Sequence, residues 1–159
     1  MKPRIYTDTS VLGGCEDDEF SEHSLRLIEA FISGKLTLVI SELTLRELET
    51  APEGVRRIVE QVPVAHIEVL LLSPEVEELA SAYIEEGAIG ARMRADALHI
   101  ALASIARVDV LVSWNFKHIV NLQRIHVYNA VNLKRGYPLL EIRSPLEVPD
   151  DEEAYSQEF

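Results

Sequence analysis

The sequence predicts an α/β fold in which a mostly parallel sheet of four to five strands is covered by helices on both faces. Two observations lead to this class. Short apolar runs of strand character alternate along the chain with stretches that have helical spacing. No Pro-, Gly- or Ser-rich linker divides the 159 residues, so we expect one domain built around one sheet.

Two strands and three helices are expected in the first half of the chain. The first helix carries an apolar stripe and reaches Gly34, a residue type that commonly ends helices. Pro52 separates the next two helical stretches and stands near the start of the second. The expected strands are residues 4–8 and 36–41, and the expected helices are residues 21–35, 42–49 and 52–62. The stripe of the first helix consists of Leu25, Ile28, Phe31 and Ile32.

The second half of the chain repeats this alternation around a helix that is apolar on nearly every side. Ser73 and Pro74 are typical of a helix N-terminus, and Gly87 stands at the far end of that helix. The next helix has few polar positions, so we expect it to be buried. The expected strands are residues 67–73, 109–114 and 138–144. The expected helices are the stretch between Ser73 and Gly87, residues 90–108, a short stretch from Phe116, and residues 124–136.

The chain is acidic, and its charge is unevenly distributed. The formal net charge at pH 7 is −12, and six of the acids lie in the last 13 residues, which contain no Lys or Arg. We therefore expect a folded domain over residues 1–146, with a formal charge of −6, and a solvated, mobile acidic tail over residues 147–159. Because phosphate contacts need Lys and Arg, any binding to nucleic acid would require a local basic patch.

The remaining composition narrows the class of protein. Cys15 is the only cysteine, which excludes an internal disulfide and a thiolate zinc cluster. No apolar run approaches the roughly 18–20 residues of a membrane span, and no long apolar segment follows the basic residues near the N-terminus. We expect a cytoplasmic protein that makes no contact with a membrane.

Four polar residues are placed where an open α/β sheet binds its ligands, outside the carboxyl ends of the strands. Asp8 ends the first strand-like run, and Asn115 directly follows the fourth. Glu47 lies on the helix after the second strand, and Asp96 lies early in the buried helix that leads into the fourth. We expect these three acids and one amide to meet at one edge of the sheet.

Each of these residues also has a purely structural interpretation. Asp8 can cap a following helix, Glu47 can be a solvated helix residue, and Asn115 can make a turn. Asp96 is surrounded by apolar neighbours, where a carboxylate is costly unless it pairs with a nearby arginine or binds a metal. His99 stands on the same helix face as Asp96, where a hydrogen-bonded core histidine is the simpler interpretation.

The joint arrangement favours a metal site. Carboxylates that are forced together raise one another's pKa, and a divalent cation relieves that cost. Oxygen ligands without thiolates or paired histidines favour Mg²⁺ or Mn²⁺ over Zn²⁺. Such a cation polarises phosphoryl oxygens and supplies hydroxide near neutral pH.

Four segments together resemble the PIN-domain ribonucleases, and within them the VapC-like toxins of type II toxin–antitoxin pairs. They are YTDTSVL at Asp8, VISELTLRELE at Glu47, ADALHIALA at Asp96 and LVSWNFKHIVN at Asn115. The resemblance covers residues 4–143. It implies a three-layer αβα sandwich, an acidic cluster that binds Mg²⁺ or Mn²⁺, hydrolysis of RNA phosphodiesters, a protein antitoxin and a homodimer.

The chain departs from the family pattern at one position. Many members carry Asp where this chain has Asn115, so the site has one negative charge fewer. An amide oxygen still accepts a hydrogen bond or coordinates a metal directly. The missing charge places a second metal ion in doubt more than the first. The expected substrate-binding residues are the nearby basic side chains Arg92, Arg94, Lys117 and His118.

Three hypotheses follow. In the first, the protein is a metal-dependent endoribonuclease: Asp8 and Asp96 hold Mg²⁺ or Mn²⁺, Asn115 assists, and Glu47 holds metal or orients the attacking water. In the second, the same fold carries a weakened site and acts through a protein partner. In the third, Asp8 belongs to a phosphotransfer enzyme of the receiver or haloacid-dehalogenase type, but DTSVL lacks the second Asp two residues on that the dehalogenase pattern needs.

Overall fold

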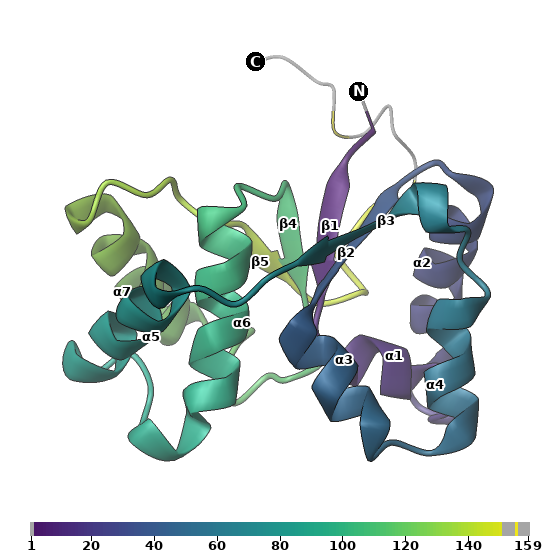
Figure 1. The fold of residues 1–159 in the computed structure, drawn as a ribbon, viewed down its shortest axis with the longest axis horizontal. Helices are drawn as coiled ribbons and strands as arrows, with labels where there is room; N and C mark the ends of the chain where they lie inside the picture. Colours follow the sequence, from purple (N-terminus) through teal and green to yellow (C-terminus); the bar gives the residue numbers. More distant parts are fainter. Residues whose placement is uncertain (1, 151–154, 156–159) are drawn as a thin grey trace.

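Five short parallel strands form the central sheet, in the order β3-β2-β1-β4-β5 (Figure 1). The computed structural model describes residues 2–150 and residue 155. The strands are β1 (Arg4–Thr7), β2 (Thr37–Ser41), β3 (Ile67–Leu70), β4 (Val110–Val112) and β5 (Ile142–Arg143). All four neighbouring pairs are parallel, which confirms the α/β fold expected from the sequence.

Helices connect the strands along the chain. They are α1 (Thr9–Gly14), α2 (Ser21–Ser33), α3 (Glu42–Glu49), α4 (Glu53–Glu60), α5 (Pro74–Glu85), α6 (Arg94–Ile105) and α7 (Leu122–Lys134). Two short 3₁₀ turns lie at Val64–His66 and Ala91–Met93. Within the part of the chain that is described, no helix is both long and apolar enough to cross a bilayer.

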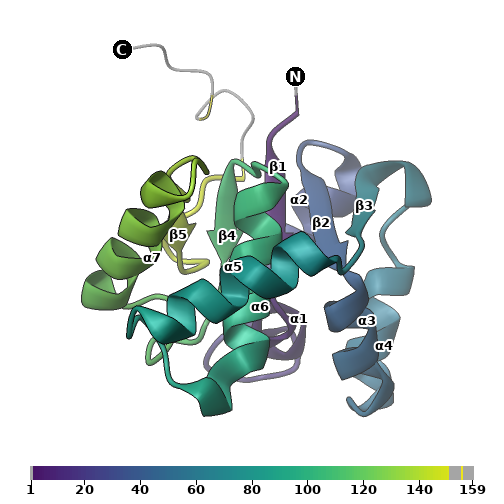
Figure 2. The ribbon, with the colours of Figure 1, turned by 60° about the vertical axis from the view of Figure 1, so that its left-hand side comes forward.

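The two faces of the sheet are covered by different helices. Ile5 in β1 packs into a core with residues of α1, α2 and α4, whereas its neighbour Tyr6 packs into a second core with α5 and α6. Successive strand residues point to opposite faces, so each strand contributes to both cores. Figure 1 and the rotated view in Figure 2 show α1, α2 and α4 on one side of the sheet and α5, α6 and α7 on the other. The molecule is therefore a three-layer αβα sandwich.

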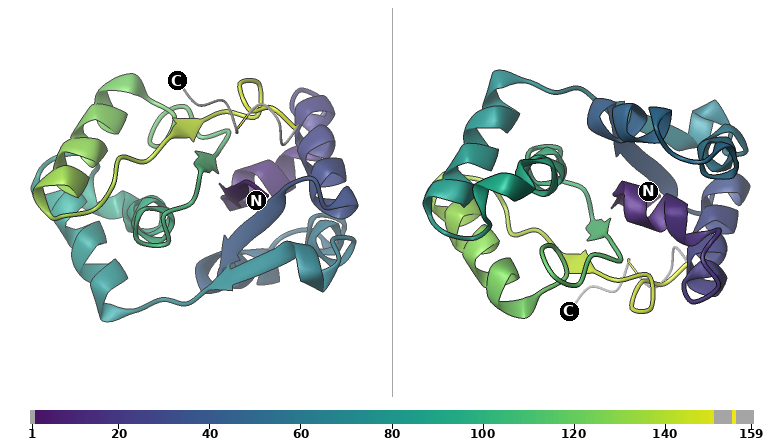
Figure 3. Two further views of the ribbon diagram at one scale, coloured as in Figure 1. Left: turned by 90° about the horizontal axis from the view of Figure 1, so that it is seen from above. Right: turned by 90° about the horizontal axis from the view of Figure 1, so that it is seen from below.

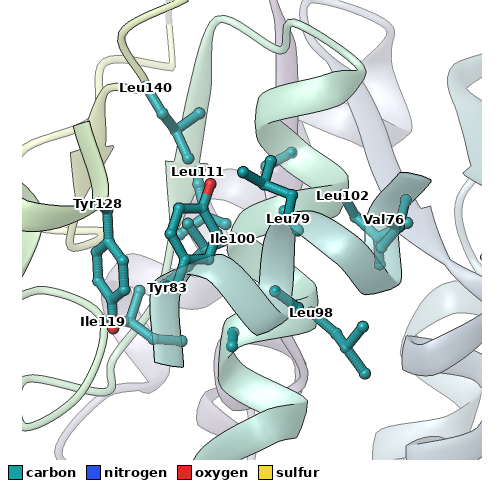
Figure 4. Packing of buried hydrophobic residues seen from close by; sticks show 14 of the residues in the cluster. Val76, Leu79, Tyr83, Leu98, Ile100, Leu102, Leu111, Ile119, Tyr128 and Leu140 are labelled. Carbon is teal, nitrogen blue, oxygen red and sulfur yellow. The ribbon is translucent and has the colours of Figure 1, made fainter. Parts of the chain in front are cut away.

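The core on the α6 side explains why that helix is apolar all round. Ile100 and Leu102 of α6 lie among side chains of α5, such as Leu79 and Tyr83, and face Leu111 of β4 (Figure 4). Tyr83 and Tyr128 meet edge to face, with ring centroids 5.2 Å apart. Because α6 is covered by the sheet on one side and by α5 on another, few of its positions contact water.

Several element boundaries differ from the sequence expectation. The expected helix 90–108 divides into the 3₁₀ turn Ala91–Met93 and α6, and it ends before Arg107, which adopts a left-handed φ of 54°. The expected strand 138–144 pairs only at Ile142–Arg143. Asn129 explains this, because its side-chain amide occupies both the N–H and the C=O of Leu140. In α2, Leu25 of the expected stripe is 41% exposed, and Leu27 is buried in its place.

The short helix α1 was not expected as a separate element. It contains Gly13 and Gly14, which are poor helix formers. Position 14 requires glycine because the side chains of Ser24 and Trp114 pack directly against its backbone. A Cβ there would lie 2.6 Å from Ser24 Oγ and 2.8 Å from Trp114 Nε1. Packing of α1 against α2 and the β4 exit therefore outweighs its weak intrinsic propensity.

The expected tail begins with residues that are packed against the domain. Val148 is buried in the core on the α2 side. Arg26 of α2 donates hydrogen bonds to the carbonyl oxygens of Pro145 and Val148, at 2.8 and 3.2 Å, and lies 3.8 Å from Asp150. The boundary expected at residue 147 therefore falls inside packed structure. Residues 151–154 and 156–159, which carry the remainder of the expected tail, lie outside the described residues.

Candidate active site

The candidate site lies at the carboxyl ends of β1 and β4, at the point where the strand order changes direction. The chain moves from β1 to β2 and β3 on one side, whereas β4 and β5 lie on the other. Thr7, the last residue of β1, is in register with Val112, the last residue of β4. In open α/β sheets, ligands bind at such a switch point. Figure 3 (right) views the molecule from this end of the sheet, where α1 and α3 begin.

Asp8 follows β1 and is held by two hydroxyl groups. Ser10 Oγ donates to Asp8 Oδ1 at 2.5 Å, and Ser113 Oγ donates to Asp8 Oδ2 at 2.6 Å. Asp8 occupies the N-cap position of α1, yet its side chain makes no capping hydrogen bond. The residue is only 5% exposed. Burial raises the pKa of the Asp8 carboxyl above its ordinary value, and the charge of His99 and the two serine hydroxyls partly oppose this rise.

Asn115 connects this aspartate to Asp96. The backbone N–H of Asn115 donates to Ser113 Oγ at 2.9 Å, and Asn115 Nδ2 lies 3.3 Å from Asp96 Oδ2. The amide oxygen of Asn115 accepts the backbone N–H groups of Lys117 and His118, at 3.2 and 2.9 Å. The sequence raised a metal-binding role for this oxygen, but the loop already uses it. The group that Asn115 presents to the acidic cluster is instead its NH₂.

Asp96 lies in the first turn of α6, where the other acids act on it. Burial raises the pKa of the Asp96 carboxyl; the charges of Asp8 and Glu47 raise it further, whereas those of His99 and His118 lower it. Carboxylates affect one another in this way when they are close together in a poorly solvated region. The three acids named from the sequence therefore gather at one edge of the sheet.

Glu47 of α3 is positioned by a chain of hydrogen bonds that reaches back into the sheet. His99 Nε2 lies 2.6 Å from Glu47 Oε1, and Thr9 Oγ1 donates to the same oxygen at 3.0 Å. On the other side of the imidazole, His99 Nδ1 lies 2.6 Å from the hydroxyl of Tyr6. That hydroxyl lies 2.8 Å from Ser41 Oγ, and both groups are buried. Burial acts to raise the pKa of Glu47, but the hydrogen bonds and charge of His99, together with Thr9, bring it below its ordinary value.

The hydroxyl and imidazole groups around the acids were not assigned a site role from the sequence. His99 is a hydrogen-bonded core histidine, as expected, but its partner is one of the site acids. Its place three residues after Asp96 was the available signal, since both lie on one helix face. Ser10 and Ser113 are small hydroxyl residues next to strand ends. This pattern is too common to identify them as hydrogen-bond donors to Asp8.

The basic residues expected to contact substrate have different surroundings. Arg94 is bound to Glu77 and Ser81 of α5, at 2.6 and 3.1 Å, so it links α6 to α5. Arg92 and Lys117 are exposed. His118 is half-buried beside Asp96, with its Nδ1 buried and without a hydrogen-bond partner among the described residues. A role in substrate binding stays a prediction for all four.

The donor groups suit a hydrated hard cation. Among residues 2–150 and Tyr155, no group of three or more His, Cys, Asp or Glu side chains is arranged to hold a metal ion. Mg²⁺, however, usually keeps several waters and binds through one or two carboxylates and substrate phosphates. Asp8 and Asp96 provide two oxygen donors whose pKa values are raised chiefly by burial, and that of Asp96 also by the neighbouring acids. Their chemistry fits Mg²⁺ or Mn²⁺.

The three-layer sandwich with the strand order β3-β2-β1-β4-β5 is a PIN-like fold. Among solved structures, the chain is similar to VapC20 of Mycobacterium tuberculosis, described as a toxin that cleaves the sarcin–ricin loop. The TM-score is 0.55 at 17% sequence identity, and the match covers 72% of this chain and 92% of VapC20. No protein-family model matches the sequence. No curated protein sequence matches it either.

Proposed function

We propose that this protein is a divalent-cation-dependent endoribonuclease that hydrolyses RNA phosphodiesters and acts as the toxin of a toxin–antitoxin pair. The observation that carries the proposal is the meeting of three acids at the sheet's switch point. Hydrogen bonds through Ser113 and Asn115 connect Asp8 to Asp96. Glu47 is held beside them by His99, three residues after Asp96, and by Thr9, next to Asp8. A cluster of acids beside a buried histidine suits cation-assisted phosphoryl chemistry. The similarity to VapC20 makes structured RNA the first substrate class to test.

Each polar side chain has a role in this mechanism. Asp8 and Asp96 would hold Mg²⁺ or Mn²⁺, with waters completing the coordination. When bound, such a cation stabilises charge on the phosphoryl oxygens and makes hydroxide available near neutral pH. Glu47 keeps Oε1 on His99 and Thr9, so its Oε2 is left to accept a proton from the attacking water. Asn115 holds the Asp96 carboxylate in place through its NH₂ group.

Cleavage of RNA by variants of matched chemistry tests the proposal. Purified protein should cut a structured RNA that contains a sarcin–ricin-type loop in Mg²⁺ or Mn²⁺, and excess chelator should stop the reaction. Asp96→Asn should reduce cleavage to a small residual rate. Asp18→Asn, the same chemical change at an exposed position, should leave the rate unchanged. If Asp96→Asn cuts as fast as Asp18→Asn, the activity comes from another site or from a contaminant and the proposal is wrong.

A second candidate is a binding module with a weakened site that acts through a protein partner. The observation that favours it is Asn115, because a neutral amide adds no negative charge to balance a cation. Its NH₂ group also hydrogen-bonds to one oxygen of Asp96. Titration calorimetry separates the two candidates. Failure to bind Mn²⁺ at millimolar levels, together with tight binding of an antitoxin-like peptide, would favour the module over the nuclease.

The toxin assignment carries further proposals about partners and location. A toxin of this class would be covered by an antitoxin protein that blocks the acidic site, and it would act in the cytoplasm as a homodimer. Sedimentation velocity tests the dimer directly. A single species at the monomer mass over the working concentration range would exclude it.

A further inference from the structure

A polar hollow of about 460 Å³ lies beside the candidate site, between the loop after α5 and the start of α7. Its lining consists of Gly87, Ala88, Lys117, Asn121, Gln123, Arg124 and Val127. Ligand pockets in proteins typically have volumes of about 300–1,000 Å³, so the hollow has room for part of a nucleotide. The mechanism above uses none of these side chains.

Arg124 is fixed in this hollow by the backbone. Its Nε donates to the carbonyl oxygen of Lys117 at 3.0 Å, and its Nη1 donates to that of Ala88 at 2.8 Å. Nη2 makes no hydrogen bond with the described residues, so the guanidinium has donors left for another acceptor. A pre-positioned arginine loses little side-chain entropy on binding an anion, and its planar fork suits phosphate.

The charge of the lining is positive in a strongly acidic protein. Lys117 and Arg124 are its two charged residues, and no Asp or Glu contributes to it. Other surface hollows carry both signs: Glu53 and Glu60 accompany Arg56 and Arg57 in one of them. Lys117 makes no ion pair with the described residues, so its ammonium group is available to a ligand. These features favour an anionic ligand.

The hollow adjoins the acidic site through two connections. The backbone N–H of Lys117 donates to Asn115 Oδ1 at 3.2 Å. The hydroxyl of Tyr128 on α7 donates to the carbonyl oxygen of His118 at 2.6 Å, which holds α7 against the loop that follows Asn115. A strand whose scissile phosphate lies at Asp96 would therefore pass a cationic hollow next.

We propose that this hollow binds a phosphate of the RNA strand next to the scissile one, with Arg124 and Lys117 as its phosphate contacts. The inference rests on the proposed ribonuclease function. It gives an acidic protein the local positive site that strand binding requires. Contacts of this kind fix the register of a strand and carry little sequence information.

Binding of a short, fluorescently labelled single-stranded RNA in excess chelator tests the hollow without requiring cleavage. For Lys117→Gln, we expect weaker binding and a salt dependence of log K that is shallower by about 0.7, the value for one lost phosphate contact on a single strand. Gln123→Glu places a negative charge in the lining and should weaken binding about threefold or more. Gln123 is exposed in the first turn of α7, where Glu favours the helix, so this variant should fold.

Gln61→Glu is the matched control, because it makes the same change at an exposed position after α4. It should bind like the wild type. If Gln61→Glu and Gln123→Glu weaken RNA binding equally, the cause is a general charge effect, and the proposed phosphate site in the hollow is wrong. Wild-type affinity and salt slope in both hollow variants would also overturn it, even if the protein cleaves RNA. Displacement of the RNA by a nucleoside monophosphate at equal concentration would overturn the assignment to a strand.

Discussion

His99 Nε2 and Glu47 Oε1 lie 2.6 Å apart, and the other imidazole nitrogen is hydrogen-bonded to the buried hydroxyl of Tyr6. His99, which is held by Tyr6 of β1, thus determines where a carboxylate at the rim of the sheet can point. The Glu47 side chain is about one-third exposed, and without this contact only the hydroxyl of Thr9 would restrict its rotamer.

Loss of the imidazole should therefore impair the reaction more than the fold. We expect His99→Leu to lower kcat/KM for RNA roughly ten- to a hundredfold, because a hydrogen bond to a charged group is worth about 1.5–3 kcal/mol. His99→Gln, whose amide can still donate to Glu47, should recover part of that loss. Steady-state cleavage with the three proteins provides the measurement. Equal activity in His99→Leu and wild type would show that His99 does not position Glu47 for the reaction.

Two buried tyrosines provide the control for this chain of contacts. Tyr6→Phe removes the hydroxyl that holds His99, whereas Tyr83→Phe removes one that is bonded to Ser104 and Asn132 on the α5 side. Each should lower the free energy of unfolding by about 1 kcal/mol. Only Tyr6→Phe should also lower the cleavage rate; a similar loss in both variants would mean that activity follows stability.

Asn115→Asp should exchange stability for cation affinity. The change removes the NH₂ that faces Asp96 and adds a like charge, so we expect the cation-free protein to lose about 1–3 kcal/mol of unfolding free energy. Mn²⁺ should bind more tightly to this variant, as measured by calorimetry. Asn121→Asp is the control, because Asn121 caps α7 through its oxygen and Asp caps equally well. Unchanged stability and Mn²⁺ affinity in Asn115→Asp would argue against the amide's contact with Asp96.

The pH dependence of stability should reveal the crowded carboxylates. Burial and the neighbouring acids raise the pKa of Asp96 above its ordinary 3.8, so the folded state holds its proton to a higher pH than the unfolded state does. Stability due to this group is therefore fully present below that value and is lost as pH rises through the folded-state pKa. Denaturant unfolding of wild type and Asp96→Asn in chelator, compared across acidic pH, measures the effect. A difference that stays constant with pH would contradict the raised pKa.

Adjacent glycines in α1 should respond in opposite ways to the same substitution. A Cβ on Gly14 would lie 2.6 Å from Ser24 Oγ, so Gly14→Ala should destabilise the protein by about 1–3 kcal/mol and disturb Trp114 at the β4 exit. No neighbouring atom lies within 4 Å of a Cβ on Gly13, so Gly13→Ala should raise stability by about 0.4–1 kcal/mol. Thermal unfolding of both variants gives the comparison, and a stable Gly14→Ala protein would show that α1 can shift.

The positions of the site acids could be predicted because they follow from the order of elements. In a parallel sheet, the residues that follow each strand reach the same edge whatever the details of the loops, which places Asp8 and Asn115 at one edge. Asp96 was identifiable because its neighbours on α6 are apolar, and a carboxylate among them is costly unless it is paired or binds a metal. The strand and helix periods were strong enough to predict the sandwich itself.

What could not be predicted depends on contacts between distant side chains. Asn115 makes the turn that its type allows, because its oxygen accepts the N–H groups of Lys117 and His118, but no local pattern indicates that its NH₂ then faces Asp96. The strand β5 is short because the side chain of Asn129, in the preceding helix α7, hydrogen-bonds to both backbone polar groups of Leu140. The hydrogen bond between His99 and Glu47 joins α6 to α3, through residues that are 52 positions apart in the sequence. In each case a specific tertiary contact decides among locally equivalent alternatives.

Cleavage of one RNA by Asp8→Asn, Asp96→Asn and the double variant, at a single Mn²⁺ concentration, tests most directly whether the acids act as one site. Residues that act as a unit show strongly non-additive losses, so removing the second should cost little more than removing the first. We expect the double variant to be no slower than the slower single variant. If the two losses multiply, the acids contribute independently, and the single cation-binding site proposed here is wrong.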